Sequence, residues 1–291
     1  MAEAHRLGRV QDDPGCRGLN PAPIGVFDSG IGGLSVLAAL RAELPHERFV
    51  YIADAGFAPY GERDAAHVVE RSRWLTQWLR AQHSVKAVVV ACNTATAAAI
   101  QHLRDGHPGL PLVGVEPALK PSIIASQTRR IGVWATRGTL ASAKFTALHA
   151  SLANQATFVL QPCDGLAEAI EHEASTGDAT KTIALCDQYM RTTSRFGVKN
   201  DEIDTLVLGC THYPFAAAHL RAVLGAQVQL VDTGAPVARQ TRRLLEAAGN
   251  LAAPAPGGGT MQLLATGDPA ALRAASTRWL GLRDTAILTL P

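Results

Sequence analysis

The sequence has no pair of cysteines in a C-x-x-C arrangement, and this absence limits what its thiols can do. Structural zinc sites and disulfide frameworks need paired or closely spaced cysteines. The five cysteines are instead odd in number and widely spaced, at Cys16, Cys92, Cys163, Cys186 and Cys210. We therefore expect neither a metal site nor a disulfide framework.

Long apolar runs and a strong charge of either sign are also missing. No apolar stretch approaches the ~18 residues that cross a bilayer, and residues 1–23 lack the apolar centre of a secretion signal. The net charge of +2 is mild and the basic residues form no stripe, which argues against a nucleic-acid partner. We expect a cytoplasmic protein without a membrane partner, and a flexible extension over residues 1–23.

What the chain does contain is typical of a compact α/β protein. Hydrophobic residues make up 47% of it and charged residues 18%. Short runs rich in Val, Ile and Leu alternate with helical patterns, which predicts parallel sheets covered on both faces. The expected strands are 24–27, 49–53, 87–91, 112–115, 131–134, 157–160, 205–209 and 227–231.

Two short segments of the first half are echoed in the second half. IGVFDSG at 24–30 is echoed by IGVWATRG at 131–138, and VVVACNT at 88–94 by LVLGCTH at 206–212. Because the echoes keep their order, we predict two similar Rossmann-like lobes related by pseudo-twofold symmetry. Ligands bind beyond the carboxyl ends of parallel strands. The two cysteines of the echoes are therefore expected to approach one ligand from opposite sides, at the interface of the lobes.

Each of these cysteines stands where an apolar strand gives way to a helix. Cys92 precedes Asn93 and Thr94, either of which can cap the following helix, and Cys210 precedes Pro214, which suits a first helical turn. A helix N-terminus lowers the pKa of a thiol and so favours the thiolate. One cysteine at such a corner is commonly a small buried hydrophobe, whereas two at matching corners favour a function.

Other polar residues lie at the same strand ends. Asp28 and Ser29 precede GIGG at 30–33, whose spacing differs from the dinucleotide-binding G-x-G-x-x-G. Asp28 would repel phosphate and is better suited to binding an ammonium group or orienting a thiol, with helix capping as the alternative. The turn APYG at 58–61 offers backbone amides for a carboxylate, with Tyr60 placed to close the cleft.

His212 lies two residues after Cys210 and leaves two interpretations open. One is a Cys-His hydrolase pair, which leaves Cys92 unexplained, and the other is a hydrogen-bonded structural histidine. Glu168 and Glu171 share one face of a predicted helix, and most such pairs are solvated.

Two thiols on opposite sides of a carbon atom can invert its configuration. A thiolate removes the proton from one face while a thiol delivers a proton to the other. The reverse reaction exchanges the roles, which explains why both sides carry the same residue type. A pyridoxal enzyme would need a Schiff-base lysine. None of the five lysines stands at a comparable corner, so we expect no cofactor.

The motifs FDSGIGGLSVL, APYGER, ACNTATA, ATRGT, LVLGCTHYPF and VDTGA occur in this order and resemble those of the bacterial glutamate racemases. The resemblance implies a cofactor-independent enzyme that interconverts L- and D-glutamate for peptidoglycan synthesis. It also implies a first lobe of residues 24–116 and 228–291, a second lobe of residues 117–227, and an active site between them.

The resemblance extends to individual residues. It assigns the acid and base to Cys92, which deprotonates D-glutamate in the family, and Cys210, which deprotonates L-glutamate. Asp28 and His212 match the auxiliary groups, and Glu171 an acidic residue near the second cysteine. The positions that match substrate-binding residues are Asp28, Ser29, Tyr60, Gly61, Asn93, Thr94, Thr211 and His212.

The sequence departs from the family pattern at residues 54–58, where DAGFA replaces the usual D-T-A-R before P-Y-G. This form resembles a proteobacterial subtype, some members of which carry N-terminal extensions and need a cell-wall precursor as activator. A UDP-linked muropeptide is therefore a candidate partner, and a homodimer a candidate assembly. Two alternatives stay open: an aspartate or hydantoin racemase of the same superfamily, and a non-catalytic two-lobed ligand-binding protein.

Overall fold

The computed structural model of the chain describes residues 20–283 and 285–290, within which ten strands form two sheets. Every strand pairing is parallel. The six-stranded sheet has the order β10-β9-β2-β1-β3-β4. Its members are β1 (Ile24–Asp28), β2 (Phe49–Ala53), β3 (Ala87–Val90), β4 (Leu112–Gly114), β9 (Met261–Thr266) and β10 (Ile287–Leu290). The four-stranded sheet has the order β6-β5-β7-β8, with β5 (Arg130–Ala135), β6 (Thr157–Pro162), β7 (Thr205–Leu208) and β8 (Gln229–Val231).

The same strand order occurs in both sheets, which confirms the two-lobed fold expected from the sequence echoes. The run β2-β1-β3-β4 corresponds to β6-β5-β7-β8, so that β1 matches β5 and β3 matches β7. In each lobe the chain moves first to one side of the initial strand and then to its other side. Ligand sites of parallel sheets lie at this kind of switch point, beyond the carboxyl ends of the strands. The fold therefore places one such point beside Cys92 and another beside Cys210.

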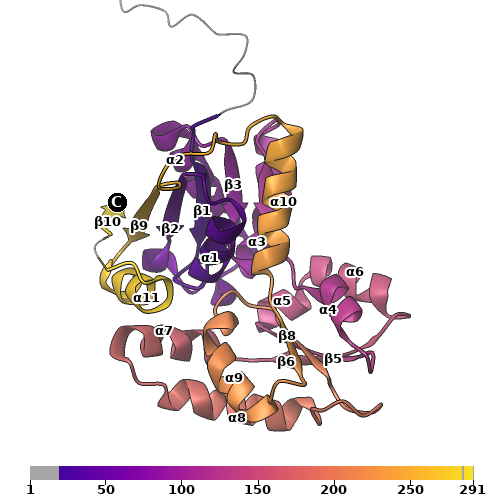
Figure 1. The fold of residues 1–291 in the computed structure, drawn as a ribbon. Helices are drawn as coiled ribbons and strands as arrows, with labels where there is room; N and C mark the ends of the chain where they lie inside the picture. The colour runs from indigo at the N-terminus through magenta and orange to yellow at the C-terminus, as the bar shows by residue number, and fades with distance from the viewer. Residues whose placement is uncertain (1–19, 284, 291) are drawn as a thin grey trace, which may run out of the picture.

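Helices cover both faces of each sheet, as the continuously apolar strands require (Figure 1). On the six-stranded sheet, one face carries α1 (Leu34–Glu43), α10 (Gly234–Ala247) and α11 (Ala270–Leu280), and the other carries α2 (Ala65–His83) and α3 (Asn93–Gly106). On the four-stranded sheet, one face carries α7 (Leu166–Thr176), α8 (Thr180–Thr193) and α9 (Ala217–Leu224), and the other carries α4 (Leu119–Ala125) and α6 (Ala143–Leu152). The short helix α5 (Arg137–Ala141) follows β5.

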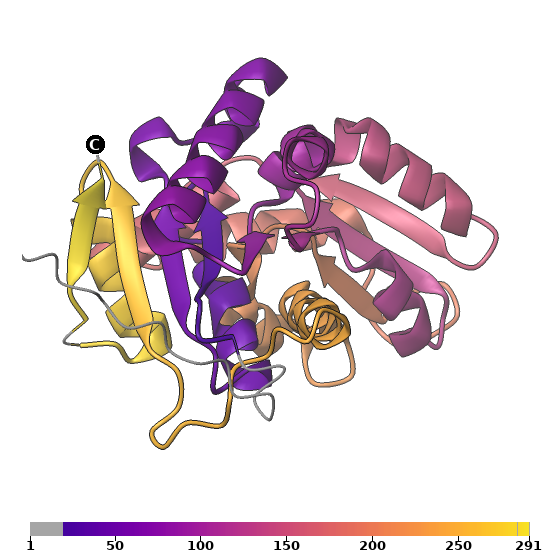
Figure 2. The same ribbon diagram turned by 90° about the horizontal axis from the view of Figure 1, so that it is seen from above.

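The C-terminal part of the chain returns to the first lobe and extends its sheet. The strand β9 pairs with β2, and β10 pairs with β9 at the edge of the sheet, where the yellow strands stand next to the indigo ones in Figure 2. Neither strand was among those expected from the sequence. We expected the chain to re-enter the first lobe at residue 228. It does so slightly later, because β8 pairs with β7 and keeps residues 229–231 in the second lobe. The stretch at 253–259 contains no helix or strand and lies mostly at the surface, as its composition predicts.

Residues 20–23 belong to the first lobe, although we expected them within the N-terminal extension. The Asn20 carbonyl accepts a hydrogen bond from Lys86 Nζ at 2.6 Å, and the Pro23 carbonyl accepts one from the Lys86 amide at 3.0 Å. The rest of the predicted extension, residues 1–19 with Cys16, lies outside the described residues. Among the described residues, no helix is long and apolar enough to span a membrane.

Candidate active site

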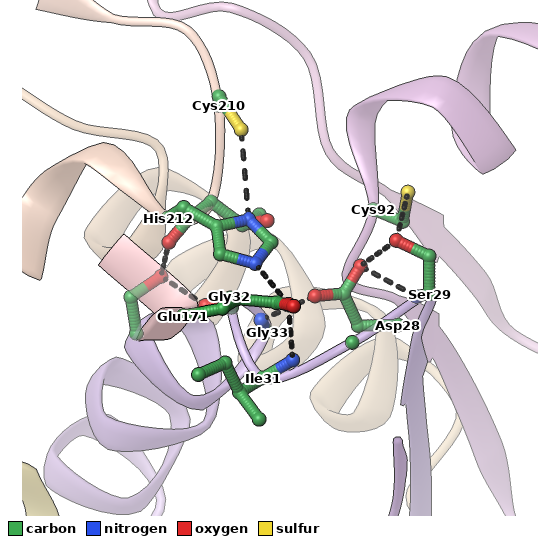
Figure 3. Close-up of polar contacts among 12 residues, drawn as sticks. Asp28, Ser29, Ile31, Gly32, Gly33, Cys92, Glu171, Cys210 and His212 are labelled. Carbon is green, nitrogen blue, oxygen red and sulfur yellow. Dashed lines mark hydrogen bonds and ion pairs between the residues drawn. The ribbon is translucent and has the colours of Figure 1, made fainter. Parts of the chain in front are cut away.

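The polar strand ends of the two lobes meet in one cluster (Figure 3). Three hydrogen bonds join the lobes there. Asn93 Nδ2 donates to the Gly209 carbonyl at 2.6 Å, Ser35 Oγ donates to the Thr211 carbonyl at 2.7 Å, and the Ile31 amide donates to Glu171 Oε1 at 3.4 Å. Cys92 and Cys210 stand on opposite sides of this cluster, Cys92 beside Ser29 and Cys210 beside His212.

The first-lobe half of the cluster is organised by the buried carboxylate of Asp28. Its Oδ2 accepts from the Gly33 amide at 2.6 Å and its Oδ1 from the Ser29 amide at 2.7 Å. These bonds fold the glycine loop around the end of β1. Cys92 Sγ donates to Ser29 Oγ at 3.7 Å, and that hydroxyl contacts Asp28 Oδ1 at 3.4 Å. Asp28 is therefore linked to the thiol through Ser29, in line with the thiol-orienting role expected for it.

The thiol of Cys92 is itself the N-cap of α3, a role that we expected of Asn93 or Thr94. The helix begins at Asn93 itself, and the Ala95 amide donates to Cys92 Sγ at 3.4 Å. The expected fall in the pKa of this thiol does not occur. Burial, joined by the negative charge of Asp28, raises the pKa of Cys92 and outweighs the opposing effect of its hydrogen bonds with Ala95 and Ser29. In this arrangement Cys92 is a thiol rather than a thiolate.

The second-lobe half is organised by an imidazole. Cys210 Sγ lies 3.7 Å from His212 Nδ1, and His212 Nε2 lies 2.8 Å from Glu171 Oε1. Burial opposes a charge on the ring, but the hydrogen bonds to Cys210 and Glu171 prevail and raise the pKa of His212 well above 6.5. The side chain of Glu171 is 39% exposed. Burial is likewise outweighed at Glu171, whose pKa the His212 hydrogen bond lowers. His212 is thus an imidazolium held between a carboxylate and a sulfur atom.

The two halves influence each other because they are close and withdrawn from solvent. Cys92 is 5% exposed and Cys210 7%, so neither sulfur faces bulk water. The charge of Cys210 contributes to the raised pKa of Cys92. Burial raises the pKa of Asp28, and the charge of His212 only partly offsets this rise. Proton affinities in such a water-poor site depend strongly on neighbouring charges.

The remaining candidates for substrate binding line the same region. The buried Asn93 uses its amide nitrogen on Gly209, while its Oδ1 accepts no hydrogen bond from the described residues. Thr94 is half-buried in the first turn of α3, and Thr211 is buried beside His212. These groups directly follow the two cysteines in the sequence and lie at both strand ends in space.

The P-Y-G turn offers its backbone amides to a ligand, and not the phenol group of Tyr60. The Tyr60 hydroxyl donates to Asp54 Oδ2 and is therefore engaged within the first lobe. Tyr60 and Gly61 begin the 3-10 helix η2 (Tyr60–Glu62), where no earlier helical carbonyl accepts from their amides. A Cβ atom built on Gly61 would have open space around it. The amides of this turn are thus available to a carboxylate.

Some sequence candidates lie elsewhere, and some contacts were not foreseen. Glu168 points to solvent, 3.7 Å from Lys181 Nζ, and Cys163 and Cys186 are buried in the core of the second lobe. The close approach of Gly32 to the second lobe was not predicted from the sequence, and an added Cβ at this position would overlap the His212 ring. The glycine pair at 32–33 was a visible signal, but its partner is distant in sequence.

Comparisons with known proteins identify the family. The model of a family described as Asp/Glu/Hydantoin racemase matches residues 34–241. A glutamate racemase from Ectopseudomonas mendocina is 50% identical over 224 residues, which cover 77% of this chain and 82% of that protein. A crystal structure of a glutamate racemase from Bacillus anthracis is 30% identical with a TM-score of 0.80, covering 93% of this chain and 97% of that one.

A third relative was solved with ligands. The crystal structure of Escherichia coli glutamate racemase in complex with L-glutamate and the activator UDP-MurNAc-Ala is 31% identical with a TM-score of 0.78. The match covers 92% of this chain and 98% of the Escherichia coli chain. Sequence, fold and the paired cysteine corners agree, and the chain belongs to the glutamate racemases of the Asp/Glu/hydantoin racemase family.

Proposed function

We propose that the chain interconverts L- and D-glutamate by a two-base mechanism in which Cys92 and Cys210 are the acid and base. The observation that carries the proposal is the placement of one thiol at the equivalent strand end of each lobe, in a single interlobe cluster. Each thiol has its own auxiliary group, Asp28 for Cys92 and His212 for Cys210.

For L-glutamate as the substrate, we assign the role of base to Cys210, which lies beside the imidazolium of His212. The role of acid falls to Cys92, because its raised pKa keeps the proton on the thiol. The Cys210 thiolate removes the α-hydrogen of L-glutamate, and the resulting carbanion takes the Cys92 proton on its opposite face. D-glutamate leaves a thiol at Cys210 and a thiolate at Cys92, so the proton count balances and the reverse reaction exchanges the roles.

The substrate is held by groups from both strand ends. The amides of Tyr60 and Gly61 suit one carboxylate, and Asn93 Oδ1 is a free acceptor for the ammonium group. The hydroxyls of Ser29, Thr94 and Thr211 complete the set that we assign to substrate binding.

Incubation with L-glutamate in deuterated water, without added cofactor, tests the reaction and the mechanism together. We expect deuterium at the α-carbon with loss of optical rotation. Racemisation without deuterium uptake would contradict exchange through two thiols. A parallel assay on aspartate tests the main alternative, since faster turnover of aspartate would reassign the substrate.

We further propose that this reaction supplies D-glutamate for peptidoglycan in the cytoplasm, and that a UDP-linked muropeptide activates it. The Escherichia coli relative, solved with such an activator, supports the second part. Turnover should be compared with and without a UDP-linked muropeptide, in the full chain and after deletion of residues 1–19. A deletion ending there keeps the contacts of Asn20 and Pro23 with Lys86. Equal rates in all four assays would exclude activation.

A further inference from the structure

A buried polar cluster behind the P-Y-G turn has no part in the proton transfers described above. Its centre is Asp54, which follows β2 and is fully buried. Arg71 of α2 contacts both of its oxygens, with Nη2 at 2.8 Å from Oδ1 and Nε at 3.1 Å from Oδ2. Thr266, at the end of β9, donates to Oδ1 at 2.9 Å, and the Tyr60 hydroxyl donates to Oδ2.

Four donor atoms thus converge on one carboxylate, and they come from three separate segments of the first lobe, namely α2, β9 and the P-Y-G turn. The guanidinium of Arg71 is also stacked on an aromatic ring, with its central carbon 3.4 Å from the centroid of Phe57. Its side chain is only 12% exposed. A bidentate, desolvated arginine–carboxylate pair fixes geometry more tightly than a solvated ion pair. Each oxygen of the buried Asp54 carboxylate accepts two hydrogen bonds, so this cluster differs from a solvated surface ion pair.

The cluster fixes the loop that connects β2 to α2. The Gly56 amide, in the 3-10 helix η1 (Ala55–Phe57), donates to Thr266 Oγ1 at 3.1 Å, and Tyr60 is anchored through Asp54. This loop carries the P-Y-G turn, and η2 packs against α3, which Cys92 caps, and against α5 of the second lobe. A shift of the cluster would therefore move the amides of Tyr60 and Gly61 at the interlobe site.

We infer that Arg71 is a positioning residue, which acts through Asp54 and the Tyr60 hydroxyl to hold the P-Y-G amides where they bind a substrate carboxylate. The inference rests on the proposed function, because it assigns those amides to the substrate. It also gives the C-terminal strand β9 a part in the site, through Thr266. Both enantiomers carry the same carboxylates, so the loss of this positioning weakens both substrates alike and leaves the two thiols unchanged.

The test compares Arg71→Met, Arg71→Lys and Arg242→Met in the full chain. Arg242 lies on α10 of the same lobe, away from the cysteines, and its Nε is 2.7 Å from Oε1 of Glu43 on α1. Its replacement therefore controls for the loss of an arginine. We expect Arg71→Met to raise KM about 10-fold for both enantiomers while kcat changes less than about twofold, which is the pattern of a lost binding contact. Arg71→Lys should recover part of the affinity, and Arg242→Met should keep the wild-type KM.

Tyr60→Phe and Thr266→Val each remove one hydrogen-bond donor to Asp54 and keep its ion pair with Arg71. These two variants therefore test the inference if the Arg71→Met protein does not fold. Each should raise KM by about 2–5-fold in a protein that still melts cooperatively. A folded Arg71→Met protein with wild-type KM, or Tyr60→Phe and Thr266→Val proteins with wild-type KM, would overturn the inference. So would a fall in kcat at constant KM.

Calorimetric titration with D-glutamate separates this inference from the proposed function. If the wild type binds D-glutamate but does not racemise it, the proposed function fails while the affinity of the Arg71 variants still tests positioning. If the wild type racemises glutamate and the variants bind it as tightly as the wild type, the inference alone fails.

Discussion

The two halves of the active site share a strand order and differ in the charge beside each thiol. In the first lobe, Cys92 caps the 14-residue helix α3 and is linked to the carboxylate of Asp28 through Ser29. In the second lobe, Cys210 precedes the four-residue 3-10 helix η3 (Tyr213–Ala216) and contacts an imidazolium. Repeated topology therefore decides where the thiols stand, while the neighbouring side chains give each thiol a different electrostatic environment.

This difference makes the site asymmetric although the chemistry it performs is symmetric. The equilibrium constant of a racemisation is unity, so kcat/KM must be equal in the two directions for every variant. The asymmetry can appear only in exchange reactions, in kcat and KM taken separately, and in isotope effects. The predictions below use these readouts to separate the two halves.

Removal of one thiol should have the largest effect. We expect Cys92→Ser and Cys210→Ser each to slow inversion by about 10³-fold or more, because each removes one of two acid–base groups. Each variant keeps one thiol, which can still exchange the proton on one face of the α-carbon. Cys92→Ser should exchange the α-hydrogen of L-glutamate with deuterated water without inverting it, and Cys210→Ser should do so with D-glutamate, as followed by NMR and chiral chromatography.

The control for these variants is Cys186→Ala, because Cys186 is buried in the core of the second lobe and should be dispensable for inversion. Exchange of both enantiomers by either serine variant would show that the two cysteines do not serve opposite faces.

Replacement of the auxiliary groups should have a smaller, direction-dependent effect. We expect His212→Gln and Asp28→Asn to lower kcat by about 10–10²-fold, since each leaves its thiol in place. His212→Gln should make removal of the L-glutamate proton slower, and Asp28→Asn removal of the D-glutamate proton. α-Deuterated substrates measure this, with the larger isotope effect on L-glutamate in the first variant and on D-glutamate in the second. Equal isotope effects on both enantiomers would refute the division of roles.

A glycine in each lobe offers a purely steric comparison. A Cβ on Gly32 would overlap the His212 ring and lie 2.7 Å from Thr211 Oγ1, whereas a Cβ on Gly138 of α5 would meet only the Gly61 carbonyl at 3.7 Å. Gly32→Ala should lower kcat/KM by about 10-fold or more, because small displacements of reacting groups are costly. Gly138→Ala should stay within about twofold. Similar activities of the two variants would mean that the lobes do not need this close approach.

The positions of the thiols were predictable from the sequence, but their electrostatic surroundings were not. Polar residues after apolar strands mark the ligand edge of a parallel sheet, and this local rule located Asp28, Cys92 and Cys210. The pKa of Cys92 was predicted with the wrong sign, because the effect of the helix N-terminus is local, while burial and the charge of Asp28, a residue distant in sequence, arise only in the folded protein.

Contacts between residues distant in sequence, and the strands β9 and β10, were not predicted from the sequence, for related reasons. Glu171 and His212 lie 41 residues apart, and Glu171 and Ile31 140 residues apart, so no local pattern joins them. The strand β10 has four residues and is partly exposed at the sheet edge, and the first two residues of β9 are only partly buried. Short edge strands carry little of the buried, β-branched pattern by which strands are recognised.

The smallest expected effect concerns the ion pair between His212 and Glu171 beside Cys210. His212 has a raised pKa and so contributes stability that is complete below pH 6.5 and is lost as the pH rises through its folded-state pKa. Glu171 has a lowered pKa and contributes stability that is present above pH 4.5 and is lost as the pH falls through its folded-state pKa. The pair should therefore stabilise the protein fully between these two values.

Glu171→Gln should reveal this window in the melting temperature. Because the Glu171 side chain is 39% exposed, solvent screening limits the loss to about 1 kcal/mol or less, or about 1–3 °C in Tm. The difference from wild type should be largest between pH 4.5 and 6.5 and should shrink toward either extreme. Glu168→Gln removes the same charge from the same helix at an exposed site 3.7 Å from Lys181, and should show no such maximum. Indistinguishable pH profiles for the two variants would mean that His212 keeps its proton without Glu171, which would leave Cys210 as its sole stabilising partner.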